Sequence, residues 1–264
     1  MVDRLKFLSL FLILIPFFAG NRAFAQDDGF VSMPSPLQIV MIFQSPDLTF
    51  DSTLINPPSK ADTYKNEYRQ ILNYGVYLAD LAYCIQNNEN ETAVKYLHVL
   101  KKIGARANMN QYFDKYDLYN RFEKNIENKD SMMTILLDMS LIFEAFVGDK
   151  ELMRVVGIQF AGIWIEGAYI ASQNASFESE ESLNKILVHQ YPVLENIVNV
   201  LKSVESADPL HKEFSQGLED LIIAMSKMKT IKKFMKKKNE IPLTEAELKI
   251  VEEKIRRIRQ KVIE

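Results

Sequence analysis

The sequence has few of the residues from which metal sites and disulfide frameworks are built. Its 264 residues include one cysteine, Cys84, and three histidines. A single cysteine cannot close a disulfide within the chain, and no paired His or Cys spacing typical of a zinc site occurs. The glycine-centred loop of an EF-hand calcium site is missing as well. We therefore expect no metal and no other cofactor.

Motifs of the common catalytic and nucleotide-binding classes are also missing. There is no Gly-x-Ser-x-Gly nucleophile elbow, and no glycine-rich phosphate loop follows a predicted strand. Cys84 lies between apolar neighbours in a helical pattern, where a lone cysteine usually acts as a small apolar filler. These absences favour a protein without enzymatic activity.

The first 25 residues have the three parts of a cleaved signal peptide. Arg4 and Lys6 supply positive charge, residues 7–18 form a nearly unbroken apolar run, and residues 23–25 match an A-x-A cleavage site. The apolar run is too short to span a bilayer core, which needs about 20 residues. The sequence therefore predicts export, with cleavage after Ala25.

The predicted mature chain begins at Gln26, where a bacterial lipoprotein would have its cysteine, so no lipid anchor is expected there. Loss of residues 1–25 reduces the 32 basic and 35 acidic residues of the whole chain to 29 and 34, a net charge of −5. A mildly acidic chain is a poor candidate for nucleic-acid binding. Export without disulfides fits a bacterial periplasm better than a eukaryotic exterior.

The distribution of proline divides the mature chain. Five prolines lie in residues 26–59, and only three follow. We interpret residues 26–59 as a proline-rich lead-in that lies on a helical body. Residues 60–206 form the predicted helical core, and residues 207–264 form a C-terminal helical hairpin that packs on this core or projects from it.

From residue 60 onwards, apolar side chains recur at helical spacing. Helices are predicted at 60–88, 90–104, 108–127, 130–147, 149–174, 179–206, 209–238 and 244–263. Thr244 and Glu247 form a capping box at the start of the last helix. Short connections between long helices favour antiparallel neighbours. The predicted fold is all-α, a single domain of about eight antiparallel helices, arranged as a bundle or as an array of helical hairpins.

Two of these helices share a short glycine-containing pattern. Residues 75–78 read Gly-Val-Tyr-Leu and residues 162–165 read Gly-Ile-Trp-Ile, an offset of 87 positions. An old duplication of a helical unit and a coincidence between two apolar helices explain this pattern about equally well.

The same two helices carry a stripe of polar positions on an otherwise apolar surface, at spacings of three and four residues. Its members are Asn73, Tyr77, Asp80, Cys84 and Asn87 in the first helix, and Gln159, Gly162, Glu166, Tyr169 and Gln173 in the second. A helix that is apolar on nearly all sides is central in its fold. Asp80 and Glu166 are therefore expected to be buried or to line a groove.

Two interpretations of these carboxylates remain open. A buried carboxylate must be paired, hydrogen-bonded or protonated. In the favoured, structural interpretation its partner is a tyrosine hydroxyl or one of four arginines, namely Arg69, Arg106, Arg121 and Arg154. In the alternative interpretation the carboxylates belong to a ligand-binding or enzymatic cavity, lined by Tyr77, Asp80, Trp164, Glu166 and Tyr169. Structural ion pairs perturb carboxylates as readily as active sites do.

The helical segment 60–175 also resembles a known group of proteins. Residues 73–83, 121–131 and 162–169 are similar to motifs of an uncharacterised family of exported helical proteins from Bacteroidota. The resemblance implies an exported all-α protein and adds no chemistry. Many of those proteins carry a lipobox cysteine, which this chain does not have.

Seven lysines crowd residues 227–238, interleaved with apolar residues in an amphipathic pattern. A solvated helix end is the favoured interpretation, because the helix dipole favours lysine near a C-terminus. Alternatively, the cluster contacts an anionic membrane surface or an acidic partner. The residues proposed for that contact are Lys232, Lys233, Lys236, Lys237 and Lys238.

The last helix carries a narrow apolar seam at spacings of three and four residues, formed by Leu248, Val251, Ile255, Ile258 and Val262. We expect this seam to fold back on helix 209–238, and a homodimer through residues 244–263 is the alternative. The predicted function is a non-enzymatic periplasmic binding or interaction module. The sequence does not identify its partner, and an envelope protein and an anionic membrane surface are the two candidates. The cavity around Asp80 and Glu166 and the membrane-contacting lysine cluster are the alternatives.

The leader gives a first test. We expect the chain isolated from its native cell to begin at Gln26 and to fractionate with the cell envelope contents, because the cleavage site follows the apolar run directly. N-terminal sequencing and intact mass of the purified protein measure this. A cytosolic product that still begins at Met1 would contradict the prediction.

Overall fold

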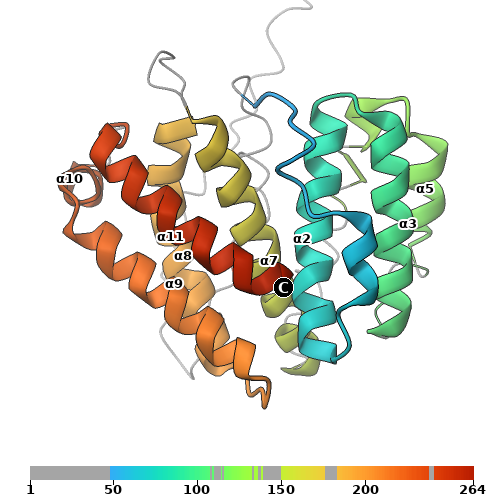
Figure 1. Ribbon diagram of the computed structural model, residues 1–264. Coiled ribbons are helices and arrows are strands. Elements are labelled where there is room, and N and C mark those ends of the chain that lie inside the picture. Colours follow the sequence, from blue (N-terminus) through green and yellow to red (C-terminus); the bar gives the residue numbers. More distant parts are fainter. Residues whose placement is uncertain are drawn as a thin grey trace, which may run out of the picture. The chain divides into compact units, whose positions relative to one another are not determined.

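The computed structural model describes residues 48–107, 109, 114, 116–132, 134–135, 138, 150–175, 183–237 and 241–264. Within these residues the structure contains helices and no strand, which confirms the predicted all-α class. In chain order they are a 3-10 helix η1 (Pro58–Asp62), α2 (Glu67–Gln86), α3 (Asn90–Arg106), α5 (Leu118–Lys124), α7 (Lys150–Asn174), α8 (Leu183–Ser203), α9 (Pro209–Lys227), α10 (Lys229–Lys237) and α11 (Glu245–Ile263) (Figure 1). The predicted signal peptide and most of the lead-in lie outside the described residues.

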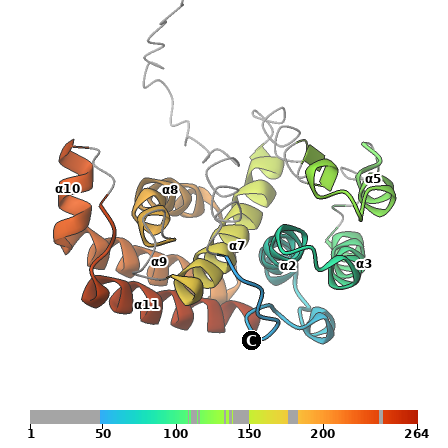
Figure 2. The same cartoon turned by 90° about the horizontal axis from the view of Figure 1, so that it is seen from above.

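The helices form two layers. Helices α3, α2, α7 and α8 follow one another in a row, with α7 between α2 and α8 (Figure 2). Helices α9 and α11 lie side by side on one side of α7 and α8. Helix α11 runs across α7 and ends beside α2 (Figure 1). The last helix of the chain therefore reaches the central pair α2 and α7.

Helices α2 and α7 cross at two glycines. A Cβ atom on Gly75 would lie 2.1 Å from the backbone oxygen of Gln159, and one on Gly162 would lie 2.0 Å from the backbone oxygen of Leu72. Any side chain at either position would push the two backbones apart. The repeated glycine pattern in the sequence thus occurs where the two helices are in backbone contact.

Helix α7 contains a segment, Leu152–Asn174, that is long and apolar enough to cross a membrane. Two polar residues, Gln159 and Glu166, interrupt its apolar sequence. In the structure 83% of its most apolar window is buried inside the protein, so the segment serves as a central core helix. Its apolar composition follows from helices packing on nearly all its sides.

Three predicted helix boundaries are wrong. Helix α2 begins at Glu67, not at residue 60, because the Asn66 side chain caps it by accepting the Arg69 N–H. The predicted helix 108–127 is interrupted, since Asp117 has a φ of 52° and α5 starts only after it. The predicted helix 209–238 breaks at Met228, whose ψ of 142° ends α9. The end of the predicted helix 130–147 lies outside the described residues.

Hydrogen bonds from another helix stabilise the break at Met228. The exposed helix start that it creates is met by Glu247 of α11, whose carboxylate accepts the Thr230 N–H at 3.3 Å and the Thr230 hydroxyl at 2.7 Å. A carboxylate at this position satisfies orphan N–H groups and suits the helix dipole. Glu247 also completes the predicted capping box with Thr244, which is confirmed.

The C-terminal hairpin packs on the core. All five seam residues of α11 are buried, each less than 9% exposed: Leu248, Val251, Ile255, Ile258 and Val262. They face α9 and α7 of the same chain. The alternative of a projecting hairpin is therefore wrong, and a homodimer through this seam would have to displace contacts within the chain.

The glycine crossing gives a stability test. We expect Gly75→Ala to lower the free energy of unfolding by about 2–4 kcal/mol, because its Cβ would overlap backbone atoms that cannot rotate away. The matched control is Gly217→Ala in α9, whose Cβ would meet only the Ile258 side chain, at 3.0 Å. There the higher helix propensity of alanine, up to about 1 kcal/mol, offsets a small side-chain shift. Urea unfolding curves measure both. Equal free energies of unfolding for the two variants would contradict the close backbone contact at the α2–α7 crossing.

Candidate functional site

The crossing of α2 and α7 brings the two predicted carboxylates together. Asp80 and Glu166 are both completely buried, and the Glu166 carboxylate is close enough to raise the pKa of Asp80. The prediction that at least one of them is buried and contacts a basic or tyrosine side chain is confirmed. Two carboxylates in this position repel each other unless a proton or a cation lies between them.

The cation is Arg259 of α11. Its Nη2 donates to Glu166 Oε1 at 2.6 Å and its Nε donates to Glu166 Oε2 at 2.8 Å, a two-pronged ion pair with the Arg259 side chain 9% exposed. The guanidinium also lies over the Tyr169 ring, 4.3 Å from the centroid. Arginine suits this position because its planar fork matches a carboxylate.

None of the four arginines expected from the sequence is the partner. They pair with other carboxylates instead: Arg69 with Asp208, Arg106 with Asp62, Arg121 with Asp138 and Arg154 with Glu67. In the sequence, Arg259 is one of several charged residues next to the α11 seam. Arg259 directly follows the buried Ile258. Because α11 packs across α7, the Arg259 side chain is buried between these helices.

Asp80 holds the segment that precedes η1. Its Oδ2 accepts the backbone N–H of Asn56 at 3.1 Å. The hydroxyls of Tyr96 and Tyr77 donate to the carbonyls of Asn56 and Pro57, each at 2.9 Å. Nη2 of Arg259 adds a bond of 2.8 Å to the Leu54 carbonyl. Residues 54–57 are thus fixed on the helical body by polar groups of α2, α3 and α11, as expected for this part of the lead-in.

A second set of polar groups holds the end of α11. The last helical carbonyls, of Val262 and Ile263, would otherwise lack partners. Asn73 donates to Val262 at 3.0 Å, and Lys60 and the Tyr64 hydroxyl donate to Ile263 at 3.0 and 3.3 Å. The cluster therefore joins both flanks of the described chain to α2.

Burial and the neighbouring Glu166 carboxylate raise the pKa of Asp80 well above its usual range, while Arg259 opposes the shift. Burial alone would lower the pKa of Arg259, but its hydrogen bonds and charge interaction with Glu166 raise it overall. Burial likewise raises the pKa of Tyr77 and Tyr96. The cluster thus favours the neutral form of Asp80 beside the Glu166–Arg259 ion pair, in a site closed to solvent.

The other predicted binding residues lie in the same core with different roles. Trp164 is 2% exposed, and its indole N–H has no described hydrogen-bond acceptor. Gln159 is 1% exposed, and neither of its amide atoms has a described partner. Tyr169 is only half-buried and reaches the cluster through the Arg259 guanidinium. The residues that sequence reasoning missed are Asn56, Tyr64, Tyr96 and Arg259, which lie outside the two polar stripes.

The lysine cluster is solvated on one side only. Lys232, Lys233 and Lys236 are exposed, whereas Ile231 and Phe234 on the other side of α10 are 1% and 5% exposed. The Phe234 ring meets the His189 ring of α8 edge-on, at 5.0 Å between centroids. The amphipathic pattern therefore packs α10 onto α8. The side chains of Lys237 and Lys238, which were also proposed for the surface contact, lie outside the described part of the structure.

Three of the pockets lined by described residues have no member of the buried cluster in their walls. One, of about 720 Å³, lies between α9 and α11 next to the start of α10. A smaller one, of about 200 Å³, lies farther along the same two helices. The third, of about 1160 Å³, lies between the starts of α2 and α9, and the Arg69–Asp208 and Arg154–Glu67 pairs belong to its wall.

Among the described residues, no group of three or more His, Cys, Asp or Glu side chains could hold a metal ion. Comparison of the chain with family models, with curated proteins and with solved structures found no match. The resemblance to exported helical proteins of Bacteroidota therefore stays a prediction.

The buried proton gives a pH test. Unfolded Asp80 releases its proton near pH 4, but the folded chain keeps it, so the free energy of unfolding falls as pH rises above 4, by up to about 1.4 kcal/mol per pH unit. Asp80→Asn mimics the protonated acid, since its oxygen can still accept the Asn56 N–H. We expect the free energy of unfolding of this variant, relative to that of the parent, to rise steadily from pH 5 towards pH 9.

Urea unfolding at several pH values measures the free energies of unfolding of parent and variant. The contributions of the other titrating groups cancel in the difference between these two free energies. Asp62→Asn is the control, because the hydrogen bonds from Lys102 and Arg106 lower the pKa of the exposed Asp62 to about 2. Its pH profile between 5 and 9 should parallel that of the parent. A parallel profile for Asp80→Asn as well would mean that Asp80 is ionised in the folded chain.

Proposed function

We propose that this protein is an exported, non-enzymatic binding module, and that it recognises its partner with the surface formed by α9, α10 and α11. The export part of the proposal is supported by the leader, with its basic residues, short apolar run and A-x-A site. The binding part is supported by the distribution of exposed apolar side chains.

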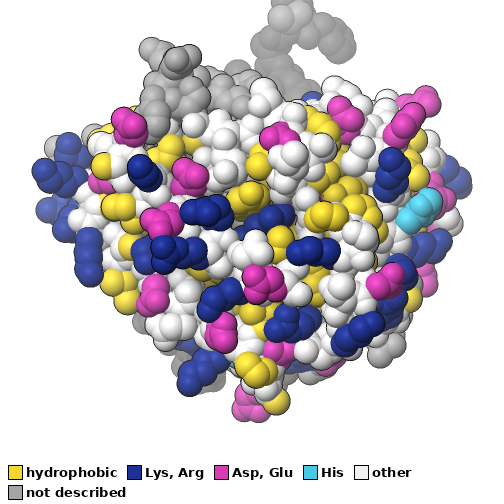
Figure 3. Space-filling model, viewed as in Figure 1, with side chains coloured by type: hydrophobic (Ala, Val, Ile, Leu, Met, Phe, Trp, Pro, Cys, Tyr) yellow, Lys and Arg dark blue, Asp and Glu magenta, His cyan; other side chains and the backbone are white. Residues whose placement is uncertain are grey.

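That distribution is the observation on which the proposal depends. Within the part of the chain that the structure describes, the large apolar side chains that are exposed are Ile223, Met235 and Ile250, at 50%, 43% and 46%. They come from α9, α10 and α11, one from each helix. Ile223 and Ile250 line the same pocket, together with three lysines. Neighbouring exposed apolar groups within a charged rim are typical of interaction sites. On the face in Figure 3, Lys and Arg side chains crowd the left edge, where Figure 1 places α10.

A catalytic cavity around Asp80 and Glu166 has less support. Both carboxylates are completely buried, and their hydrogen bonds go to Arg259 and to the backbone of residue 56. A general acid or base must reach the proton that it transfers, directly or through one water. Perturbed carboxylates that are engaged inside the protein are typical of structural networks.

Association of α10 with a membrane surface is supported by its exposed lysines and by the exposed Met235. An interfacial helix inserts its apolar side between lipid headgroups. In α10 that side, with Ile231 and Phe234, is buried against the protein. The lysines are thus available for an electrostatic contact, and Met235 is the large apolar side chain that α10 leaves exposed.

Site-specific photo-crosslinking tests the proposal. We expect a benzophenone amino acid at position 250 to give a discrete adduct in cells that make the protein natively, because Ile250 lies on the proposed surface. The matched control is the same probe at Ala105, an exposed position of α3. The adduct at position 250 should also weaken at least about 5-fold when Ile223→Asp places a charge on the facing helix.

Adducts are read on denaturing gels and by mass spectrometry, with circular dichroism as a check on folding. Equal adduct yields at positions 250 and 105 would contradict the proposed surface. Turnover of a small molecule by the purified chain that Asp80→Asn abolishes would contradict the non-enzymatic assignment.

A further inference from the structure

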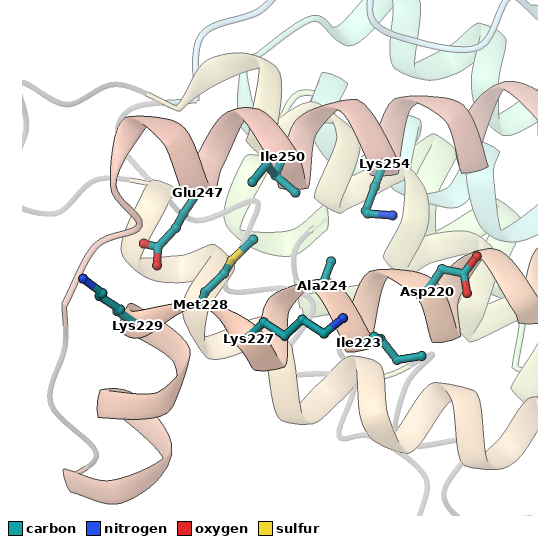
Figure 4. Close-up of a pocket in the computed structure, with 9 residues that line it drawn as sticks. All are labelled: Asp220, Ile223, Ala224, Lys227, Met228, Lys229, Glu247, Ile250 and Lys254. Carbon is teal, nitrogen blue, oxygen red and sulfur yellow. The ribbon is translucent and has the colours of Figure 1, made fainter.

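The groove between α9 and α11 has a recognisable chemistry. One of its walls is formed by α9 and the start of α10, and the other by α11 (Figure 4). The wall residues are Asp220, Ile223, Ala224, Lys227, Met228 and Lys229 on the first side, and Glu247, Ile250 and Lys254 on the second. Each wall therefore presents one half-exposed isoleucine and at least one lysine.

The groove is long and narrow. The 200 Å³ pocket farther along the helices shares Asp220 and Lys254 with the 720 Å³ pocket. Together the two pockets follow α9 from Glu213 to Lys227, a distance of about 20 Å at 1.5 Å per residue. This length corresponds to about four turns of an α-helix. An elongated occupant fits such a groove better than a compact small molecule does.

Three lysines and two acids line the 720 Å³ pocket, so its lining carries a net charge of +1. Lys227, Lys229 and Lys254 make no ion pair with any described carboxylate. The carboxylate of Glu247 is already occupied by Thr230 and Thr244. The remaining acid of the 720 Å³ pocket, Asp220, accepts a hydrogen bond from Gln216 at 3.0 Å.

We infer that this groove, here called the α9–α11 groove, binds an acidic amphipathic α-helix of a partner protein. The apolar stripe of that helix would cover Ile223, Ile250 and the Met228 side chain at the floor. Its flanking Asp and Glu residues would pair with the three lysines of the rim. Helix-in-groove recognition uses this combination of apolar anchors and complementary charge. The inference rests on the proposed binding function and names the class of partner.

A protein helix suits the groove better than a lipid surface does. The two isoleucines line a concave space between helices, which a flat bilayer surface does not fill. The apolar side of α10, which a bilayer would require, is packed against α8. The lysines contribute to both kinds of contact, so the experiment must separate them.

Fluorescence anisotropy with designed peptides tests the inference on the full mature chain. The probe is a stapled helical peptide of about 18 residues, with leucines at i, i+4, i+7 and i+11 and glutamates beside them. A second peptide carries lysine in place of every glutamate. We expect the acidic peptide to bind at least about 10-fold more tightly than the basic one.

Charge reversal in the protein should reverse this preference. The double variant Lys227→Glu with Lys254→Glu should weaken binding of the acidic peptide at least about 10-fold and strengthen binding of the basic one. Lys249→Glu is the matched control, because Lys249 is exposed on α11 but lines neither pocket. It should leave the peptide preference unchanged.

Vesicles containing phosphatidylglycerol, compared with vesicles of phosphatidylcholine alone, form the third arm. Sedimentation with the anionic vesicles, together with no preference for the acidic peptide, would overturn the inference in favour of a lipid surface. Failure of the acidic peptide to bind, or equal loss of binding in Lys249→Glu, would also overturn it. If one of these results were found while the photo-adduct at position 250 was retained, the inference would fail and the proposed binding function would stand. Absence of that adduct would contradict the proposed function and the inference together.

Discussion

The ion pair between Glu166 and Arg259 is the interaction on which the rest of this structure depends. Glu166 lies at the centre of the α2–α7 pair, and Arg259 comes from the last helix of the chain, 93 positions away. An unpaired charge at this depth would cost several kcal/mol, so α11 must dock for the core to close. Once docked, Arg259 also fixes the Leu54 carbonyl, and Asp80, which shares a site with Glu166, fixes the Asn56 N–H. One buried pair thus joins the start, the middle and the end of the described chain.

The sequence was sufficient for the helices but not for this connection. Apolar periodicity predicted the all-α class, and the polar stripes pointed correctly to Asp80 and Glu166 as buried groups. Arg259 was missed because local spacing shows only that it borders the α11 seam, while its inward orientation depends on how α11 crosses α7. The break at Met228 was missed for a similar reason, since it is stabilised by Glu247 from another helix. Both errors concern contacts between residues far apart in the sequence, which a periodic pattern does not contain.

The same docking leaves a surface available for recognition. Helix α11 uses its seam against α9 and α7, and α10 uses its apolar side against α8, so the polar and lysine-rich sides face outward. Ile223 of α9 and Ile250 of α11 remain about half exposed, and Met235 of α10 is 43% exposed. The buried carboxylates and the exposed groove therefore have separate roles. The buried carboxylates hold α11 in place. The groove has α11 as one of its walls, so it exists only while α11 is docked.

A double-mutant cycle tests the central pair most directly. The cycle compares the free energies of unfolding of the parent, Glu166→Gln, Arg259→Met and the double variant in urea at pH 7. Because each single change leaves a buried polar group without its partner, we expect losses of about 3–5 kcal/mol for each and a coupling energy of at least about 2 kcal/mol. A coupling energy below about 0.5 kcal/mol, with additive losses, would show that Glu166 and Arg259 do not stabilise the fold as a pair.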